Sequence, residues 1–257
     1  MKRLLYLMAV IMLSVPAVLR AWTVPDETLR YEVRFKWGFI DANAGVAELS
    51  TYNIPGTNQF RATLTGKSVD LLGHYYAAGD TIIGTLMSDT VQSVYTEHLS
   101  KSAGEFAIQT ITYPGAGNNG EGCVVKTLPG GRVLRERISH YGGGVTVDLL
   151  GVFYYIRQLD YSKMPPGQMV RVNIFSGTDA ETLQVHYKGT AAADCCGASV
   201  AAYNVSLTFS NNSGNSAPSQ MDVLISTDDS RIPISVTGSL KVGHIYARFI
   251  GDDPCTD

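Results

Sequence analysis

Apolar and polar side chains alternate without a break over residues 29–37. The apolar set is Leu29, Tyr31, Val33, Phe35 and Trp37, and the polar set is Arg30, Glu32, Arg34 and Lys36. Successive side chains of a strand point to opposite faces, so this period of two predicts a strand with one buried face. Residues 38–45 are expected to form a turn, and shorter alternations over 46–52 and 60–65 complete a predicted antiparallel meander.

A different spacing marks a single helix around residues 147–160. Asp148 is placed to cap its first turn by accepting from free backbone N–H groups. Pro165-Pro166-Gly167 is expected to end the helical region. An apolar stripe at helical spacing predicts that this helix packs on a sheet. The members of the stripe are Leu149, Val152, Phe153, Ile156 and Leu159.

Strand patterns recur on both sides of the helix, most cleanly over residues 203–209. About twelve strands and one helix result. The fold class is therefore mainly β, in one domain over residues 22–257. An antiparallel sheet of this size must protect its edges, which predicts a strongly curved sheet or a barrel with the helix on its concave side.

The first 21 residues have the pattern of a cleavable signal peptide. Lys2 and Arg3 precede an uncharged run over residues 4–19, and Ala21 is the small residue expected at the cleavage site. A retained anchor is the alternative, since Arg20 lies close to the cut. No Cys follows the run, so there is no lipobox, and no later segment is apolar enough to span a bilayer. The expected location is the periplasm or the extracellular space.

Charge limits the classes of partner. The mature chain keeps 17 basic and 23 acidic residues, a formal charge of −6. A chain of this charge with no basic run repels phosphate backbones and acidic membrane surfaces. We therefore expect no nucleic-acid partner and no stable membrane insertion after cleavage of the leader.

Four cysteines remain after the leader, and export favours disulfides over zinc or a reactive thiol. They are Cys123, Cys195, Cys196 and Cys255. Adjacent Cys195 and Cys196 are poorly placed to bond each other. Cross-links to Cys123 or Cys255 are therefore expected, with the pairing left open.

No catalytic motif stands out. The sequence has no Gly-x-Ser-x-Gly, no phosphate loop and no local metal motif among its five dispersed histidines. Asp228-Asp229 resembles a hydrolase or calcium pair, but Asp-Asp-Ser-Arg between two strands is also ordinary turn chemistry, with Arg231 free to pair with one carboxylate. We expect no catalytic residue, no metal and no cofactor.

Paired aromatic residues are the candidates for a ligand surface. In each tyrosine pair one ring is expected to point outward, and Arg157 is either solvated or paired with Asp148 or Asp160. Core packing is the alternative for the rings. The candidate ligand-binding residues are Trp37, Tyr75, Tyr76, Tyr154, Tyr155 and Arg157.

Three motifs in order resemble a bacterial family of exported proteins, domain of unknown function 3108. The first is Tyr-x-Val-x-Phe-x-Trp from Tyr31, followed by Ala42-Asn43-Ala44-Gly45. The second is the helix from Asp148 to Arg157, with Gly167 after it, and the third is Ser226 to Pro233, running on to Gly243. The Cys195-Cys196 pair and the loop over 114–122 depart from the pattern. The resemblance implies a β fold and export, and it implies no activity.

Fold and export together favour a non-enzymatic envelope protein that binds a lipid or other hydrophobic ligand, a glycan or a peptide. Two alternatives remain open. One is a hydrolase that acts on envelope material through the carboxylates Asp148, Asp228 and Asp229 and the dispersed histidines. The other is a surface interaction module that pairs exposed strand edges with a partner.

Overall fold

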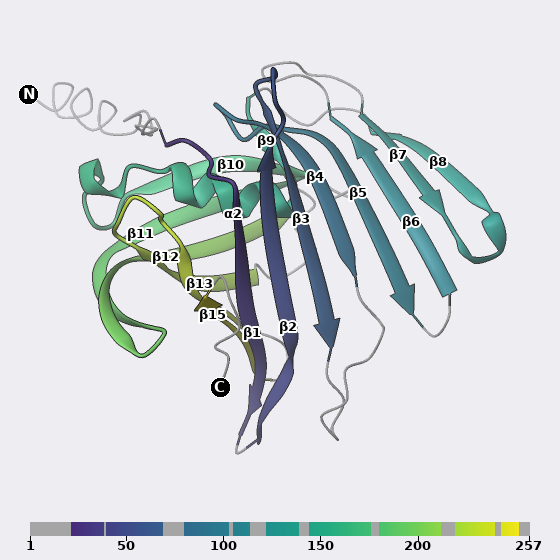
Figure 1. Cartoon of the computed structure of the whole chain (residues 1–257). Helices are drawn as coiled ribbons and strands as arrows, with labels where there is room; N and C mark the ends of the chain where they lie inside the picture. The colour runs from purple at the N-terminus through teal and green to yellow at the C-terminus, as the bar shows by residue number, and fades with distance from the viewer. Residues whose placement is uncertain are drawn as a thin grey trace, which may run out of the picture.

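The computed structural model describes residues 22–38, 40–68, 80–102, 105–113, 122–138, 144–175, 180–211, 219–239 and 243–251. One sheet of fifteen strands, in the order β8-β7-β6-β5-β4-β3-β2-β1-β15-β14-β13-β12-β11-β10-β9, forms the body of this part of the chain (Figure 1). All neighbours are antiparallel except β9 and β10, which are parallel. The predicted leader, residues 1–21, lies outside the described residues.

The strands are β1 (Glu27–Trp37), β2 (Ile40–Asn53), β3 (Gln59–Ser68), β4 (Thr81–Met87), β5 (Ser93–Ser102), β6 (Glu105–Thr112), β7 (Gly122–Thr127), β8 (Val133–Ile138), β9 (Thr146–Val147), β10 (Met169–Phe175), β11 (Ala180–Cys195), β12 (Ala198–Asn211), β13 (Ser219–Ser226), β14 (Pro233–Ser239) and β15 (His244–Gly251). The helix α2 covers Leu149–Gln158, and 3₁₀ turns cover Pro129–Gly131 and Tyr161–Lys163. The mainly β class and the single α-helix are confirmed. The strand count is not, since the sheet has three more than predicted.

The predicted turn over residues 38–45 is mostly strand. β2 begins at Ile40 and pairs with β1 from Ile40 to Thr51, with a β-bulge that leaves Ala44 unpaired. Residues 41–45 are small or polar, so the alternation of large apolar and polar side chains that predicts a strand is absent there. Gly45 is required there, because a Cβ atom would lie 2.1 Å from the carbonyl oxygen of Lys67.

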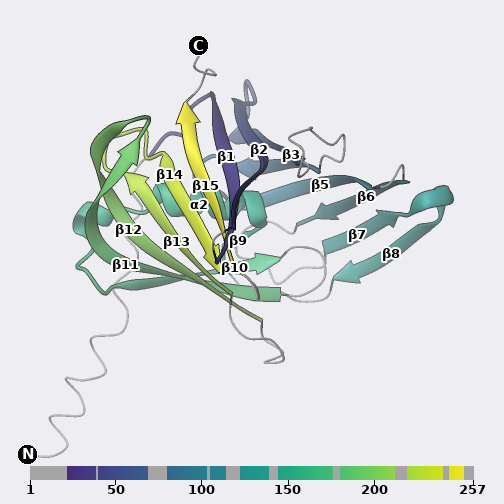
Figure 2. The same ribbon diagram turned by 90° about the horizontal axis from the view of Figure 1, so that it is seen from below.

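The sheet curves around α2 but does not close, so a closed barrel is excluded. β8 and β9 are its two ends (Figure 2). The main apolar core joins residues of β2–β4, α2 and β10–β13. The helix therefore fills the space that an empty barrel would offer to a ligand.

Burial on nearly all sides of α2 follows from this position. Asp148 caps the helix as predicted, since its Oδ1 accepts from the Gly151 N–H at 2.6 Å. The predicted stripe is only partly correct. Leu149 is 54% exposed, whereas Tyr154 and Tyr155, outside the stripe, are buried. A helix enclosed by a curved sheet buries more than one face.

Candidate functional site

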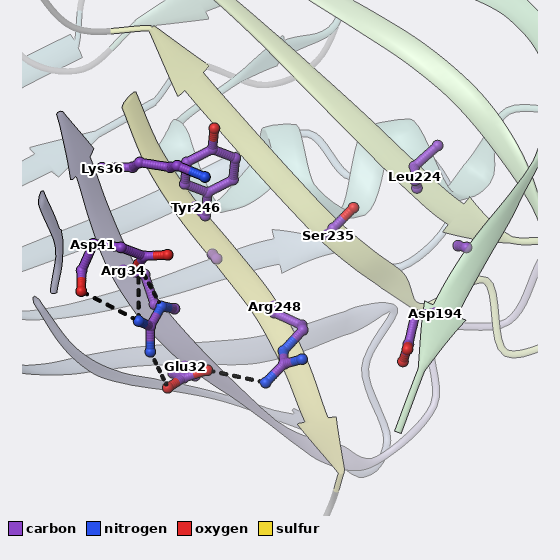
Figure 3. A pocket seen from close by; sticks show the side chains of 11 residues that line it. Glu32, Arg34, Lys36, Asp41, Asp194, Leu224, Ser235, Tyr246 and Arg248 are labelled. Carbon is purple, nitrogen blue, oxygen red and sulfur yellow. Dashed lines mark hydrogen bonds and ion pairs between the residues drawn. The ribbon is translucent and has the colours of Figure 1, made fainter. Parts of the chain in front are cut away.

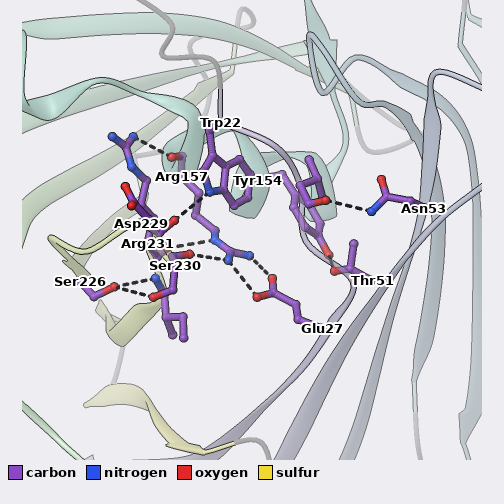
Figure 4. Close-up of polar contacts among 12 residues, drawn as sticks. Trp22, Glu27, Thr51, Asn53, Tyr154, Arg157, Ser226, Asp229, Ser230 and Arg231 are labelled. Atoms are coloured by element: carbon purple, nitrogen blue, oxygen red, sulfur yellow. Dashed lines mark hydrogen bonds and ion pairs between the residues drawn. The ribbon is translucent and has the colours of Figure 1, made fainter.

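The Arg157 guanidinium lies at the C-terminal end of α2 and is fully buried. Its Nη1 and Nη2 atoms contact the two carboxylate oxygens of Glu27, on β1, at 2.5 and 3.2 Å. Nη2 also donates to the Ser230 carbonyl oxygen at 2.8 Å (Figure 4). Arg157 is therefore paired with a carboxylate, one of the two predicted alternatives, but the partner is Glu27 and not Asp148 or Asp160. Glu27 precedes Arg157 by 130 positions, and no local pattern predicts that pairing.

Arg231 is buried beside Arg157, in the turn between β13 and β14. Its Nη1 donates to the carbonyl oxygens of Arg157, at 3.0 Å, and Leu159. Carbonyl groups at the end of a helix have no intrahelical donor, so this cation caps α2. The predicted pairing of the Arg231 side chain with an aspartate is therefore wrong. Only its backbone N–H reaches Asp228.

Asp228 organises the turn itself. Its Oδ1 accepts from the hydroxyls of Ser226 and Ser230 and from the backbone N–H groups of Ser230 and Arg231. Burial alone would raise the pKa of this carboxyl, but the hydrogen bonds from Ser230, Ser226 and Arg231 outweigh it and lower the pKa. Asp229 contributes a carbonyl oxygen, which accepts from Trp22 Nε1 at 3.2 Å. The indole of Trp22 lies 4.6 Å from the Arg157 guanidinium carbon.

The helix tyrosines belong to the core. Tyr154 is 0% and Tyr155 7% exposed. The Tyr154 hydroxyl and the Thr51 hydroxyl lie 2.6 Å apart, and its ring packs edge-on against Phe60 at 4.8 Å. Tyr154, Tyr155 and Arg157 therefore offer no exposed surface to a ligand. Tyr75 and Tyr76 lie outside the described residues, as does the side chain of Trp37.

Asp148 is buried on the opposite end of α2. Its Oδ2 accepts from the Thr96 hydroxyl, and its backbone N–H donates to Ser93 Oγ at 2.9 Å. Burial raises the pKa of this carboxyl against the opposing hydrogen bonds. Ten residues of helix separate it from the Asp228 turn, which is about 15 Å at 1.5 Å per residue. These carboxylates cannot act together on one bond, since acid–base groups must lie within hydrogen-bond reach of the same atoms.

A small cavity of about 40 Å³ adjoins Asp148 on the sheet side. His98 on β5 lines it, and its buried Nε2 finds no hydrogen-bond partner among the described residues. The volume suits ordered water and little else. Within the described ranges, no three His, Cys, Asp or Glu side chains gather as a metal site.

The vicinal cysteines lie at the tip of the β11–β12 hairpin, and both are free thiols in the structure. Cys196 and Gly197 occupy its two-residue turn, with φ of 51° and 81°. Burial raises the pKa of the Cys195 thiol. Cys255 lies outside the described residues, as does the side chain of Cys123, so the disulfides remain a prediction.

A groove of about 590 Å³ crosses the sheet next to this hairpin tip (Figure 3). We call it the charged groove. β14 and β15 lie along its middle, β1 and β2 along one side, and the tip of β11 along the other. It is lined by Glu32, Arg34, Lys36, Asp41, Ala193, Asp194, Leu224, Ser235, Tyr246, Ala247 and Arg248.

A bend in β11 creates the far wall of the charged groove. The register of β11 and β12 shifts between Tyr187 and Gly189, and Gly189 has a φ of 114°. Such a bulge bends a strand, and glycine tolerates this conformation. Beyond it, Ala193 packs against Ile234 at the start of β14. Asp194 thereby faces residues of β1 that precede it by about 160 positions.

Charges of both signs line this groove in equal number, three of each. Arg34 contacts Asp41 at 2.8 Å and Glu32 at 3.3 Å, and Arg248 contacts Glu32 at 3.2 Å. The hydrogen bond that Arg34 donates to the Asp41 carboxylate raises the pKa of Arg34. Neither Lys36 nor Asp194 forms an ion pair with a described residue. The polar residues of strand 29–37 can be recognised in the sequence, but no sequence pattern indicates that they line a groove opposite Asp194.

The described part of the chain contains no helix long and apolar enough to cross a membrane. Its fold is similar to that of a β-barrel-like protein from Brucella abortus with a domain of unknown function, DUF1849. That crystal structure aligns with a TM-score of 0.61 and 7% identity, over 89% of this chain and 97% of the other. At such low identity the likeness concerns the fold alone.

A putative lipoprotein from Parabacteroides distasonis aligns with a TM-score of 0.34 and 9% identity, over 90% of this chain and 99% of the other. No curated protein sequence matches. A family model described as a protein of unknown function, DUF3108, matches residues 30–250, which include most of β1, all of α2 and the Asp228 turn. The chain therefore belongs to the DUF3108 family.

Proposed function

We propose that this chain is an exported, non-enzymatic binding protein that holds a short peptide with charges of both signs in the charged groove. The observation that carries the proposal is the lining of that groove, with three cationic and three anionic side chains around about 590 Å³. Small-ligand sites commonly have volumes of about 300–1,000 Å³.

The chemistry of the lining favours a peptide over the other ligand classes. A hydrophobic ligand would take water from six charged groups and offer no hydrogen bonds in return. A neutral glycan would be expected to stack on several aromatic rings, and Tyr246 is the single ring among the lining residues. A peptide supplies amide groups for the polar residues and charges for Lys36 and Asp194.

These two side chains give the proposed ligand a direction. Lys36 comes from β1 and Asp194 from the tip of β11, on opposite sides of the groove (Figure 3). Neither forms an ion pair with a described residue, although the Asp194 carboxylate accepts from the Gly197 N–H at 3.0 Å. Both are therefore available to pair with charges of a ligand. The peptide's carboxylate would lie toward Lys36 and its ammonium toward Asp194. The ion-paired residues Arg34, Glu32 and Arg248 would form the rigid floor between them.

Export rests on the leader pattern of residues 1–21. Cleavage after Ala21 leaves Trp22 as the first residue. That residue is docked on Arg157 and Asp229 in the structure. The mature chain would therefore begin with a residue that the fold already holds.

A groove-filling substitution tests the proposal. Ser235→Trp places a large ring on the middle strand of the charged groove, whereas Ser239→Trp places it on the same strand outside the lining. Binding of the tripeptide Lys-Ala-Asp and of acetyl-trialanine amide is measured by isothermal titration calorimetry. We expect the wild type and S239W to bind Lys-Ala-Asp more tightly than acetyl-trialanine amide. S235W should bind Lys-Ala-Asp at least tenfold more weakly than the wild type does. Equal affinity of S235W and S239W would contradict the proposal.

A further inference from the structure

The β7–β8 hairpin forms one end of the sheet and projects away from α2 (Figures 1 and 2). Val133 is 45% and Leu134 39% exposed. Because neighbouring residues of a strand face opposite ways, each face of the hairpin exposes a large apolar side chain. No described strand other than β7 pairs with β8. An open edge flanked by exposed apolar groups is a site for strand addition.

The backbone groups that face the free edge follow from one hydrogen bond. The Leu128 N–H donates to the Arg132 carbonyl oxygen at 2.8 Å, so Arg132 faces β7. Backbone direction alternates along an antiparallel strand. The backbone N–H and C=O groups of Leu134 and Glu136 therefore face β7, and those of Val133, Arg135 and Arg137 face outward.

Charge selects the partner. Arg135 is an exposed cation on β8. Residues directly opposite each other on paired strands share a face, so an acidic residue opposite Arg135 in an added strand would meet its guanidinium. No described residue forms an ion pair with Arg135, and the hairpin is cationic although the mature chain is acidic overall.

A second copy of this chain fits the edge less well than an acidic segment. Two β8 strands related by a twofold axis normal to the sheet pair antiparallel, with each residue opposite one of the same backbone orientation. The backbone of Glu136, the acidic residue of β8, faces β7, whereas the backbone of Arg135 faces outward. Glu136 therefore lies opposite Arg135 in none of these registers, and a pairing centred on Arg135 sets like charges opposite each other.

We infer that β8 accepts an extended acidic segment of a partner protein as an added strand. Arg135 selects the acidic residue that lies opposite it. The outward backbone groups of Val133, Arg135 and Arg137 supply the ladder, and Leu134 contacts apolar residues on the opposite face. This surface is separate from the charged groove and does not depend on a ligand there.

The test uses the fluorescent peptide acetyl-Val-Glu-Val-Glu-Val-Glu-amide and fluorescence anisotropy with the full mature chain. Arg135→Pro removes an outward N–H and leaves the bonds to β7 intact, since proline is tolerated at such edge positions. Arg135→Gln keeps the N–H and removes only the charge. We expect R135P to weaken binding at least tenfold and R135Q roughly two- to fivefold, the range expected for one cross-strand charge pair.

Two peptide controls use the unaltered protein. Lysine in place of glutamate should weaken binding at least tenfold, and so should N-methylation at alternate residues, which blocks the peptide's own ladder. These controls hold even if R135P fails to fold. Binding of the lysine or N-methylated peptide as tight as that of the acidic one would overturn the inference, and so would unchanged binding by folded R135P.

Discussion

Arg157 and Arg231 each donate a side-chain hydrogen bond to the other's backbone carbonyl oxygen. Arg157 Nε reaches the Arg231 oxygen at 3.0 Å, and Arg231 Nη1 reaches the Arg157 oxygen at 3.0 Å (Figure 4). Two buried cations are thereby fixed side by side, with Glu27 ion-paired to one of them. The end of α2, the Asp228 turn and the start of β1 meet at this point.

Removal of the carboxylate should therefore be costly. Glu27→Ala leaves the Arg157 guanidinium buried without a counter-charge, and we expect the free energy of unfolding to fall by about 3–5 kcal/mol. Urea denaturation at pH 7 measures it. Glu48→Ala is the control, because Glu48 is 44% exposed in its pair with Arg30 and should cost about 1 kcal/mol or less. Equal losses in the two variants would show that the buried pair contributes no more than a surface one.

The ionised carboxylate of Asp148 should lower the stability of the fold, whereas that of Glu27 raises it. Its pKa is raised by burial, so between the unfolded value of about 4 and the folded value the folded state binds more protons. Stability from this group is present at low pH and declines as pH rises through the folded pKa. Asp148→Asn keeps the acceptor for the Gly151 N–H and can donate to the Thr96 hydroxyl.

We therefore expect Asp148→Asn to be at least as stable as the wild type at pH 7. The advantage of the variant should shrink as the pH is lowered toward about 4. Urea denaturation in steps of one pH unit from 4 to 7 gives the difference between the two proteins. A D148N variant that is less stable than the wild type by more than about 1 kcal/mol at pH 7 would show that the ionised carboxylate is needed there.

The Asp228 turn should respond to pH in the other direction. The pKa of this exposed carboxyl is lowered in the fold, so its contribution is present above pH 4 and is lost as pH falls through the folded pKa. Asp228→Ala should cost about 1 kcal/mol at pH 7, as for other capping side chains, and much less at pH 2.5. The measurement is thermal unfolding at both pH values. A cost independent of pH would assign the effect to packing.

The vicinal cysteines predict a specific cross-link. Cys195 packs against the cluster of Leu29, Tyr31 and Phe249, near the end of β15 at Gly251. Cys255 follows four residues later and lies at most about 14 Å along the chain from that end. We expect Cys255 to bond with Cys195 or Cys196 in protein exported by its host. Peptide mapping by mass spectrometry without reduction identifies the pair, and a Cys123–Cys255 peptide would contradict it.

Sequence patterns over a few neighbouring residues predicted most strands and the helix. The candidate site depends on contacts between residues far apart in the sequence, which such patterns do not show. The alternation over residues 29–37 and the Asp148 cap were readable, because each depends on neighbours within a few positions. The strand at residues 40–45 was missed, because its residues after Ile40 are small or polar. The pairing of Glu27 with Arg157 and the position of Asp194 across from β1 join segments more than a hundred residues apart, and no periodicity encodes them.

The polar face of strand 29–37 had the composition of an ordinary solvated surface. It became the wall of the charged groove only because the bulge at Gly189 brings the tip of β11 against β14. By contrast, Tyr154, Tyr155 and Arg157 were predicted to bind a ligand because their side chains are large and aromatic or charged. Large aromatic side chains commonly form the core of β proteins, and these two tyrosines do so here. Arg157 is buried at the C-terminal end of the helix.

Native mass spectrometry of the protein purified from its own envelope tests the central claim most directly. Wild type, S235W and S239W are exported in parallel and sprayed from a volatile buffer of low ionic strength. We expect an added mass on the wild type and on S239W, identified as a peptide by fragmentation and absent from S235W. An added mass that S235W retains, or one that fragments as a lipid or a neutral glycan, would contradict it.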